Sequence, residues 1–164
     1  IIAGSLGQAA FVDAKGPAAR FNAPYGIVQR ADGKLVVADQ FNNRIRLVSL
    51  DGTVETLLGS AAGFADGALG GAKLSLPQAL AQTSNGDIYV TDLSNYRVRK
   101  LSGDSLTTVV GSGEGGYLDS DDKLAAEIYG IEGLSLKADG TVMFIADGGR
   151  GESVPFNRIR SVKM

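Results

Sequence analysis

Hydrophobic and polar positions alternate in short runs along this chain, and the runs have the length of β-strands rather than helices. In residues 30–48 a turn at Asp32 and Gly33 precedes the apolar run of residues 35–38, which is followed by a polar loop and by residues 44–48. Asp-Gly pairs favour two-residue hairpin turns because both residues tolerate positive φ. The continuous apolar run predicts a strand covered on both faces, and the alternating run predicts a strand with one wet face.

This pattern of turn, strand, loop and strand occurs three times. The copies cover residues 30–48, 84–101 and 138–162, and the third is lengthened by an insertion. Other features recur in step with them, namely an aromatic-x-Asp motif, the turn pair and an Asp at the end of a strand. These features begin at Phe11, Phe64 and Tyr117; at Asp32, Asn85 and Asp139; and at Asp39, Asp92 and Asp147. Self-similarity of this length predicts a repeat architecture in which each copy is one structural unit.

Each copy predicts four short antiparallel strands joined by tight turns, which is the make-up of one β-propeller blade. In the first copy these strands are residues 24–28, 35–38, 44–48 and 54–58. We therefore expect an all-β fold, a single propeller segment over residues 1–164 with three four-stranded blades. The blades span approximately residues 6–59, 60–111 and 112–164.

The two ends of the chain match complementary parts of the repeat. The third copy stops after its third strand, whereas residues 1–5 match the end of a fourth strand, such as residues 57–60. Closed propellers have about 4–8 blades, so three blades predict half of a six-bladed ring. We expect the ring to be completed by a second copy, in a homodimer with exchanged N-terminal strands, or by further chain. Either arrangement would cover the open sheet edges.

The repeated residues resemble those of the NHL repeat family. The first copy carries Phe21-Asn22-x-Pro24-x-Gly26-Ile27, Asp32-Gly33, Val37-Ala38-Asp39, Asn43-Arg44-Ile45-Arg46 and Thr56-Leu57-x-Gly59. These motifs are specific in combination, and their copies extend over essentially the whole chain. The resemblance implies a six-bladed β-propeller that serves mostly for protein or ligand recognition. The third copy departs from the pattern, with Ile131 in place of the proline and an insertion at residues 148–156.

Charge and composition narrow the functional classes. Lys and Arg number 16 against 18 Asp and Glu, a net charge of −2, so the chain lacks the basic field typical of nucleic-acid binding. RNA binding, which some NHL domains perform, is therefore a second alternative only. No apolar run approaches the ~20 residues of a membrane span. No signal peptide is visible; the compartment stays open, with an extracellular or periplasmic location slightly favoured.

The chain has no His and no Cys, which removes most catalytic arrangements. Neither a Ser-His nor a Cys-His pair can form. The His-ligated zinc of the amidating lyases, relatives of NHL propellers, cannot be built either. We therefore expect a non-catalytic recognition or scaffold module without a cofactor. The alternative is a propeller enzyme of hydrolase or lyase type with an oxygen-ligated Ca²⁺ ion in the central channel.

The Asp and Arg residues that recur in every copy are interpreted as structural. A carboxylate beside a guanidinium can pair bidentately and accept main-chain N–H groups, and each blade needs such turn closure. The residues assigned to this framework are Asp39 and Arg44, Asp92 and Arg97, and Asp147 and Arg158. The recurring aromatic residues are expected to fill the gaps between blades.

Function is expected where the copies differ. The insertion at residues 148–156 cannot be explained by the needs of the repeat, and loops on rigid scaffolds often carry recognition. The binding candidates in it are Arg150, Glu152, Val154 and Phe156.

An acidic stretch at residues 119–122 is the second difference. Carboxylate oxygens suit Ca²⁺, but the Gly of an EF-hand loop is replaced here by Leu124. Asp119, Asp121 and Asp122 are therefore only weak metal candidates, and solvated loop acids are the favoured interpretation.

Overall fold

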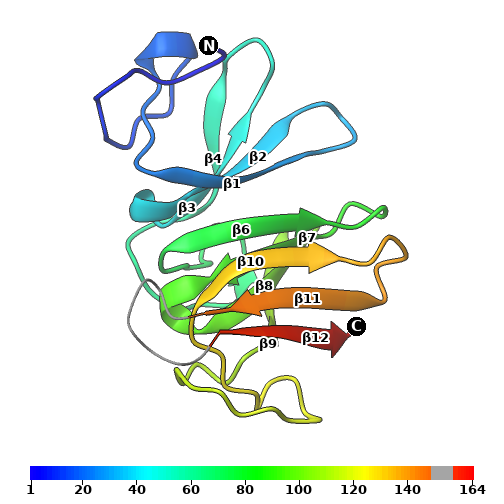
Figure 1. The fold of residues 1–164 in the computed structure, drawn as a ribbon. Helices are drawn as coiled ribbons and strands as arrows, with labels where there is room; N and C mark the ends of the chain where they lie inside the picture. The colour runs from blue at the N-terminus through cyan, green and yellow to red at the C-terminus, as the bar shows by residue number, and fades with distance from the viewer. Residues whose placement is uncertain (149–156) are drawn as a thin grey trace.

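Three antiparallel β-sheets stand side by side in the computed structural model, which describes residues 1–148 and 157–164 (Figure 1). Each sheet is built from one copy of the repeat, so the sheets are the predicted blades. Apart from one short edge strand, strand order within each sheet follows the chain, because neighbouring strands are joined by short turns. The prediction of an all-β fold made of propeller blades is confirmed.

The first sheet contains β1 (Pro24–Gln29), β2 (Leu35–Asp39), β3 (Arg44–Val48) and β4 (Val54–Gly59). In its first hairpin the Arg30 N–H donates to the Lys34 carbonyl and the Gly33 N–H donates to the Arg30 carbonyl. The loop therefore has three residues, one more than predicted. Gly33 takes φ +83°, the left-handed conformation that this type of hairpin loop requires at its last position.

The second sheet contains β6 (Pro77–Gln82), β7 (Ile88–Asp92), β8 (Arg97–Ser102) and β9 (Ser105–Val110). A fifth strand of two residues, β5 (Gly67–Ala68), pairs with the outer edge of β9. It was not predicted, because the segment that precedes each blade carries no strand pattern. In the first sheet the same place is held by a single bridge between Lys15 and Thr53.

The third sheet contains β10 (Ile131–Leu136), β11 (Val142–Asp147) and β12 (Arg158–Lys163), and no fourth strand among the described residues. β12 is therefore an open edge at the place where β3 and β8 each have a partner. Residues 1–5, expected to supply the end of a fourth strand, form no strand in this single chain. They lie against the first sheet instead, where the Gly4 N–H donates to the Gly16 carbonyl.

Helical structure in the described part of the chain is limited to three short 3-10 helices. They are η1 (Gly16–Ala18), η2 (Gln40–Asn42) and η3 (Leu93–Asn95). η2 and η3 take the same place in the first and second copies, between the second strand and the third. No helix within residues 1–148 and 157–164 is long and apolar enough to cross a membrane.

The sheets pack through their first strands. β1, β6 and β10 run next to one another (Figure 1). β1 approaches β6 so closely that a Cβ on Gly26 would collide with the Gln78 carbonyl, which explains the glycine. Apolar side chains fill both boundaries between sheets. The first boundary includes Val36, Ala38, Ile45, Leu74 and Leu80, and the second includes Tyr89, Val98, Ile128, Ile131 and Ile145.

Candidate recognition site

A fully buried arginine joins the first sheet to the segment that precedes it. Arg46 of β3 donates to Asp39 at the end of β2 and to Asp13, both at 2.6 Å. It also donates to the main-chain carbonyls of Val12 and Arg20, both at 3.0 Å. A buried guanidinium is tolerated only when its donors are paired in this way, so these contacts fix the segment in place.

The same arrangement recurs in the other two sheets. Arg99 donates to Asp92 at 2.6 Å and to Asp66 at 2.5 Å. Arg160 donates to Asp147 at 3.0 Å and pairs with Asp119 at 2.6 Å. We call each such set an arginine cage. The cages are Arg46 with Asp13 and Asp39, Arg99 with Asp66 and Asp92, and Arg160 with Asp119 and Asp147.

The predicted pairing of Asp39 with Arg44, and of Asp92 and Asp147 with Arg97 and Arg158, is wrong. Arg44 stands directly opposite Asp39 in the β2–β3 register, but Asp39 pairs with Arg46, the diagonal neighbour on the same face. A diagonal neighbour is about 7–8 Å away, which suits a long side chain. The partner of each carboxylate is the second arginine of the R-x-R motif in its own copy.

The first arginine of each motif stacks on the recurring aromatic residue. The guanidinium carbon lies 3.8 Å from the ring centre of Phe11 for Arg44, and 4.1 Å from that of Phe64 for Arg97. Arg158 lies 5.5 Å from that of Tyr117. Phe11 and Phe64 are exposed, so they do not fill gaps between blades. They instead make cation–π contacts on the surface of their own sheet.

The buried carboxyl group of the second cage is not placed for acid–base catalysis. Burial raises the pKa of Asp92, and hydrogen bonds from Asn95, the Ser75 N–H and Arg99 oppose the rise. A raised pKa also occurs in catalytic acids. Asp92 is completely buried, however, and its oxygens already accept these donors, so a substrate cannot reach the carboxyl group.

Two of the three weak metal candidates bind other groups of the protein. Asp119 pairs with Arg160, and Asp122 accepts the Leu124 N–H at 3.0 Å within its own loop. Asp121 is exposed. Within the residues that the structure describes, no three Asp or Glu side chains are grouped closely enough to hold a metal ion.

The binding candidates predicted in the insertion lie outside the described residues. They are Arg150, Glu152, Val154 and Phe156. Their assignment stays a prediction.

Three tyrosines meet at the boundary of the second and third sheets. The rings of Tyr96 and Tyr129 stack with their centres 5.8 Å apart, and the ring of Tyr117 lies 5.9 Å from that of Tyr129. We call Tyr96, Tyr117 and Tyr129 the tyrosine cluster. All three are partly exposed, and they come from three separate segments, which precede β8, follow β9 and precede β10.

Tyr96 has an unusual backbone conformation. Its φ of +51° and ψ of +47° are left-handed, a region that bulky residues rarely adopt. The equivalent residue of the first copy is Asn43, which tolerates this region and accepts the Leu76 N–H with its side-chain oxygen. Such strain costs about 1–3 kcal/mol and is concentrated at functional sites. The second copy thus has a strained tyrosine in place of an unstrained asparagine.

A glycine-rich segment passes directly against the tyrosine cluster. A Cβ on Gly115 would lie 3.0 Å from the ring of Tyr96 and 3.2 Å from that of Tyr129. A Cβ on Gly116 would collide with the carboxylate of Glu127. Arg97, which donates to the Ser112 carbonyl at 2.6 Å, adds a guanidinium beside this segment. The result is a partly exposed aromatic surface bordered by both signs of charge.

Sequence reasoning missed the tyrosine cluster. Its members are far apart in the chain, and only the fold brings them together. One signal was present, since Tyr96 stands where the first copy has Asn43 in an otherwise close alignment.

Comparison with known proteins agrees with the predicted repeat. Residues 74–101 match the family model described as NHL repeat, which confirms the resemblance in the second copy. The curated protein SUPPRESSOR OF QUENCHING 1, chloroplastic, from Arabidopsis thaliana is 39% identical over 80 residues. That alignment covers 48% of this chain but only 8% of the Arabidopsis protein.

Several solved structures share the fold. One is a protein of unknown function from Bacteroides thetaiotaomicron, with a TM-score of 0.69, 23% identity, and coverage of 76% of this chain and 32% of the other. An auxiliary nutrient binding protein from the same species has a TM-score of 0.65, 21% identity, and coverage of 74% and 34%. Virginiamycin B lyase from Staphylococcus aureus has a TM-score of 0.51, 14% identity, and coverage of 87% and 41%. The chain thus spans between 32% and 41% of the length of these three structures.

Proposed function

We propose that this chain, with its NHL repeat at residues 74–101, is a non-catalytic recognition module that binds a protein or peptide partner through a loop face of its propeller blades. The face is the one that carries the tyrosine cluster. Tyrosine and arginine are the residue types enriched in the centres of protein interfaces, because they combine a large contact area with polar groups.

The strained Tyr96 is the observation that carries the proposal. The fold needs a residue at this place that tolerates the left-handed conformation, and Asn43 meets that need in the first copy. A tyrosine here loses that advantage and gains a large ring that packs on the apolar boundary of the second and third sheets and stays partly exposed. Strained residues are concentrated at binding sites, and the exposed part of this ring supports a role in recognition.

The names of similar proteins support recognition more than catalysis. Two of the solved relatives are called auxiliary nutrient binding proteins. A lyase also shares the fold, so the fold alone does not decide between the two classes. The recurring carboxylates of this chain are used within the arginine cages, which leaves few groups for the Ca²⁺-dependent alternative.

The test uses a phage-displayed peptide library, selected against the whole chain. We expect the selected peptides to lose at least tenfold in affinity for Tyr96→Asn, which introduces the residue of the first copy. The change removes the stacked ring but keeps a residue suited to the backbone, so the chain should stay folded. Peptides that bind Tyr96→Asn as well as the parent would contradict the proposal.

A matched control tests whether the loss of any exposed aromatic ring would weaken peptide binding. Phe41 in η2 is exposed, and its equivalent in η3 is Ser94. Phe41→Ser therefore removes an exposed ring from the same place in the first copy. It should leave the affinity of the selected peptides unchanged.

A further inference from the structure

The turn that joins β6 to β7 contains a chemically reactive pair of residues. It holds Asn85 followed by Gly86, the one place in the sequence where asparagine precedes glycine. Both residues are exposed, so water reaches the asparagine amide. Asparagine is a thermolabile residue, because the main-chain nitrogen that follows it can attack its side-chain carbonyl carbon. A glycine in the next position hinders that attack least, since it has no side chain.

The backbone of the turn leaves room for this attack. Gly86 has φ +92°, and a Cβ built on it would have nothing within 4 Å. Its N–H donates to the Thr83 carbonyl at 3.0 Å, within the same exposed turn. The attack needs only this hydrogen bond to open, and the local opening of an exposed turn requires little free energy.

Two donors polarise the side-chain carbonyl group of Asn85. The Thr83 hydroxyl donates to its oxygen, and the Asp87 N–H donates to the same oxygen at 3.3 Å. The hydroxyl also lies 3.1 Å from the Asp87 carbonyl, which keeps it inside the turn. Donors at a carbonyl oxygen stabilise the negative charge that develops there when a nucleophile attacks the carbon. The turn therefore favours attack at this carbon.

The nitrogen of the Asn85 amide has a partner of its own. It donates to the Asp87 carboxylate at 3.2 Å. Asp87 in turn pairs with Lys100 of β8 at 2.6 Å. The neutral amide thus joins an ion pair that links the turn to the neighbouring strand.

The equivalent turns of the other two sheets carry a carboxylate in place of this amide. All three turns lie on one side of the molecule (Figure 1). Asp32 and Asp139 stand where the second copy has Asn85, and each accepts the N–H of the residue two positions later. Asp32 pairs with Arg30, and Asp139 pairs with Lys137, which lowers the pKa of Asp139. An ionised carboxylate is a poor electrophile, so these two turns resist the reaction.

The second copy requires a neutral residue at position 85. Its turn has Thr83 in place of the basic residue, and it has Asp87 where the other copies have Lys34 and Thr141. An amide can donate to Asp87, whereas a carboxylate would repel it. Asn85 thus fits its surroundings only as long as it remains an amide.

We propose that Asn85 is a site of spontaneous deamidation, assisted by the Thr83 hydroxyl, which converts the neutral turn of the second sheet into an acidic one. The main-chain nitrogen of Gly86 bonds to the side-chain carbonyl carbon of Asn85, and the bond from that carbon to the amide nitrogen breaks. Ammonia leaves with the proton that the Gly86 nitrogen gives up, and a cyclic imide remains. Water then opens the ring at either carbonyl, which leaves aspartate or isoaspartate.

The reaction changes the contacts of the turn. A carboxylate at position 85 loses the hydrogen bond to Asp87 and competes with it for Lys100. Isoaspartate also adds a methylene group to the main chain of the turn. The modified chain should therefore have a weaker β6–β7 hairpin. This inference goes beyond the proposed recognition function, since Asn85 precedes β7 and Tyr96 follows it, at the opposite end of the strand.

The test follows the two asparagines of the second copy in the folded whole chain, kept at mildly alkaline pH. Cleavage after Lys and Arg, at slightly acidic pH to stop the reaction, releases residues 74–97 in one peptide that contains Asn85 and Asn95. Asn95 is the internal control, because Tyr96 follows it and its amide donates to the Gly63 carbonyl at 2.8 Å. Fragment mass spectrometry should show that Asn85 exchanges its amide for a carboxyl group at least tenfold faster than Asn95.

A pair of variants tests the assistance by the hydroxyl group. Thr83→Val keeps the size of the side chain but removes the donor, so the conversion of Asn85 should slow at least threefold. Thr83→Ser keeps the hydroxyl and should convert at the rate of the parent chain. Gly86→Ala places a methyl group beside the attacking nitrogen and should slow the conversion at least tenfold.

A further variant tests the consequence for the hairpin. Asn85→Asp places the product's charge next to Asp87 and should melt at a lower temperature than the parent chain. The difference should shrink at high salt, because salt screens interactions between exposed charges.

The proposal is overturned if Asn85 stays intact in the folded chain for as long as the urea-denatured chain needs to convert completely. Equal rates at Asn85 and Asn95 would also overturn it, and an unchanged rate in Thr83→Val would refute the role of the hydroxyl. None of these results bears on peptide selection at Tyr96, so the two proposals fail separately.

Discussion

The second and third sheets carry the same arginine cage, but only the cage of the second sheet is covered by a fourth strand. Arg99 is fully buried, and the β9 strand covers Asp66 on its outer side. Arg160 makes the same contacts from β12, but its side chain keeps 10% exposure and Asp119 faces solvent. The difference between the two cages is one strand. Burial of the cage is therefore a property of the finished blade, since the motif alone brings the charges together without excluding water.

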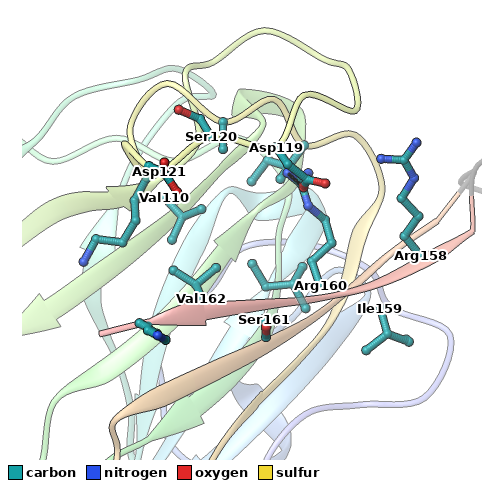
Figure 2. A pocket seen from close by; sticks show the side chains of 14 residues that line it. Val110, Asp119, Ser120, Asp121, Arg158, Ile159, Arg160, Ser161 and Val162 are labelled. Carbon is teal, nitrogen blue, oxygen red and sulfur yellow. Dashed lines mark ion pairs between the residues drawn. The ribbon is translucent and has the colours of Figure 1, made fainter.

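The largest loss of stability is expected when the buried second cage loses its arginine. Arg99→Ala leaves Asp92 buried without its main partner, and removing one member of a buried ion pair costs about 3–5 kcal/mol. Arg160→Ala should cost less than half of that, because water already reaches the third cage, where Arg160 and Asp119 line a hollow of the surface (Figure 2). Urea denaturation of both variants measures the difference. Equal costs would mean that the greater exposure of the third cage does not weaken its ion pairs.

The next largest effect is a difference in stability cost between a buried and an exposed sheet face. Ile45→Ala opens a cavity in a filled boundary, which costs about 2–5 kcal/mol for a buried Ile. Ile159→Ala should change the free energy of unfolding of the single chain by less than about 0.5 kcal/mol, as is usual for exposed sites. Urea denaturation of the two variants measures the difference. Equal costs for Ile45→Ala and Ile159→Ala would contradict this comparison of a buried with an exposed face.

A smaller effect is expected at the glycine of the N-terminal segment. Gly4→Ala forces a side chain into the left-handed region, which costs about 1–2 kcal/mol, and its Cβ would only touch the Phe21 ring at 3.5 Å. Gly111→Ala should cost more, because its Cβ would also collide with the Tyr96 carbonyl. Thermal unfolding of the two variants shows which substitution lowers the melting temperature more. The reverse order would show that the contact with the Tyr96 carbonyl does not decide the cost.

Tyr96→Asn should be close to neutral for stability. Loss of the stacked ring removes about 0.5–1.5 kcal/mol, and loss of its apolar packing against the second boundary adds to this cost. Relief of backbone strain returns about 1–3 kcal/mol, which offsets these losses, so the urea midpoint should move little. A large destabilisation would assign Tyr96 to the framework instead of to recognition.

The smallest effect concerns a surface pair that is unrelated to the cages. The hydrogen bond from Lys15 to Asp51, helped by Thr53, lowers the pKa of Asp51 to about 2. Because the folded pKa lies below the unfolded one, the pair stabilises the fold above about pH 4 and loses that effect as the pH falls toward 2. Asp51→Asn should therefore lower the melting temperature slightly at pH 7 and leave it unchanged at pH 2.

Sequence reasoning reached the fold because the repeat fixes strands, turns and their order together. It placed Asp39 in the framework but gave it the wrong arginine, since Arg44 and Arg46 lie on the same face of β3 and only side-chain length decides between them. The tyrosine cluster could not be predicted, because its rings come from three segments that meet only when two sheets pack.

Strand order has a consequence for how the molecule forms. Since each sheet is made of consecutive strands, most pairing joins residues close in sequence, and such local topologies fold faster than sheets built from distant segments. The sheets can form one after another as the chain leaves the ribosome.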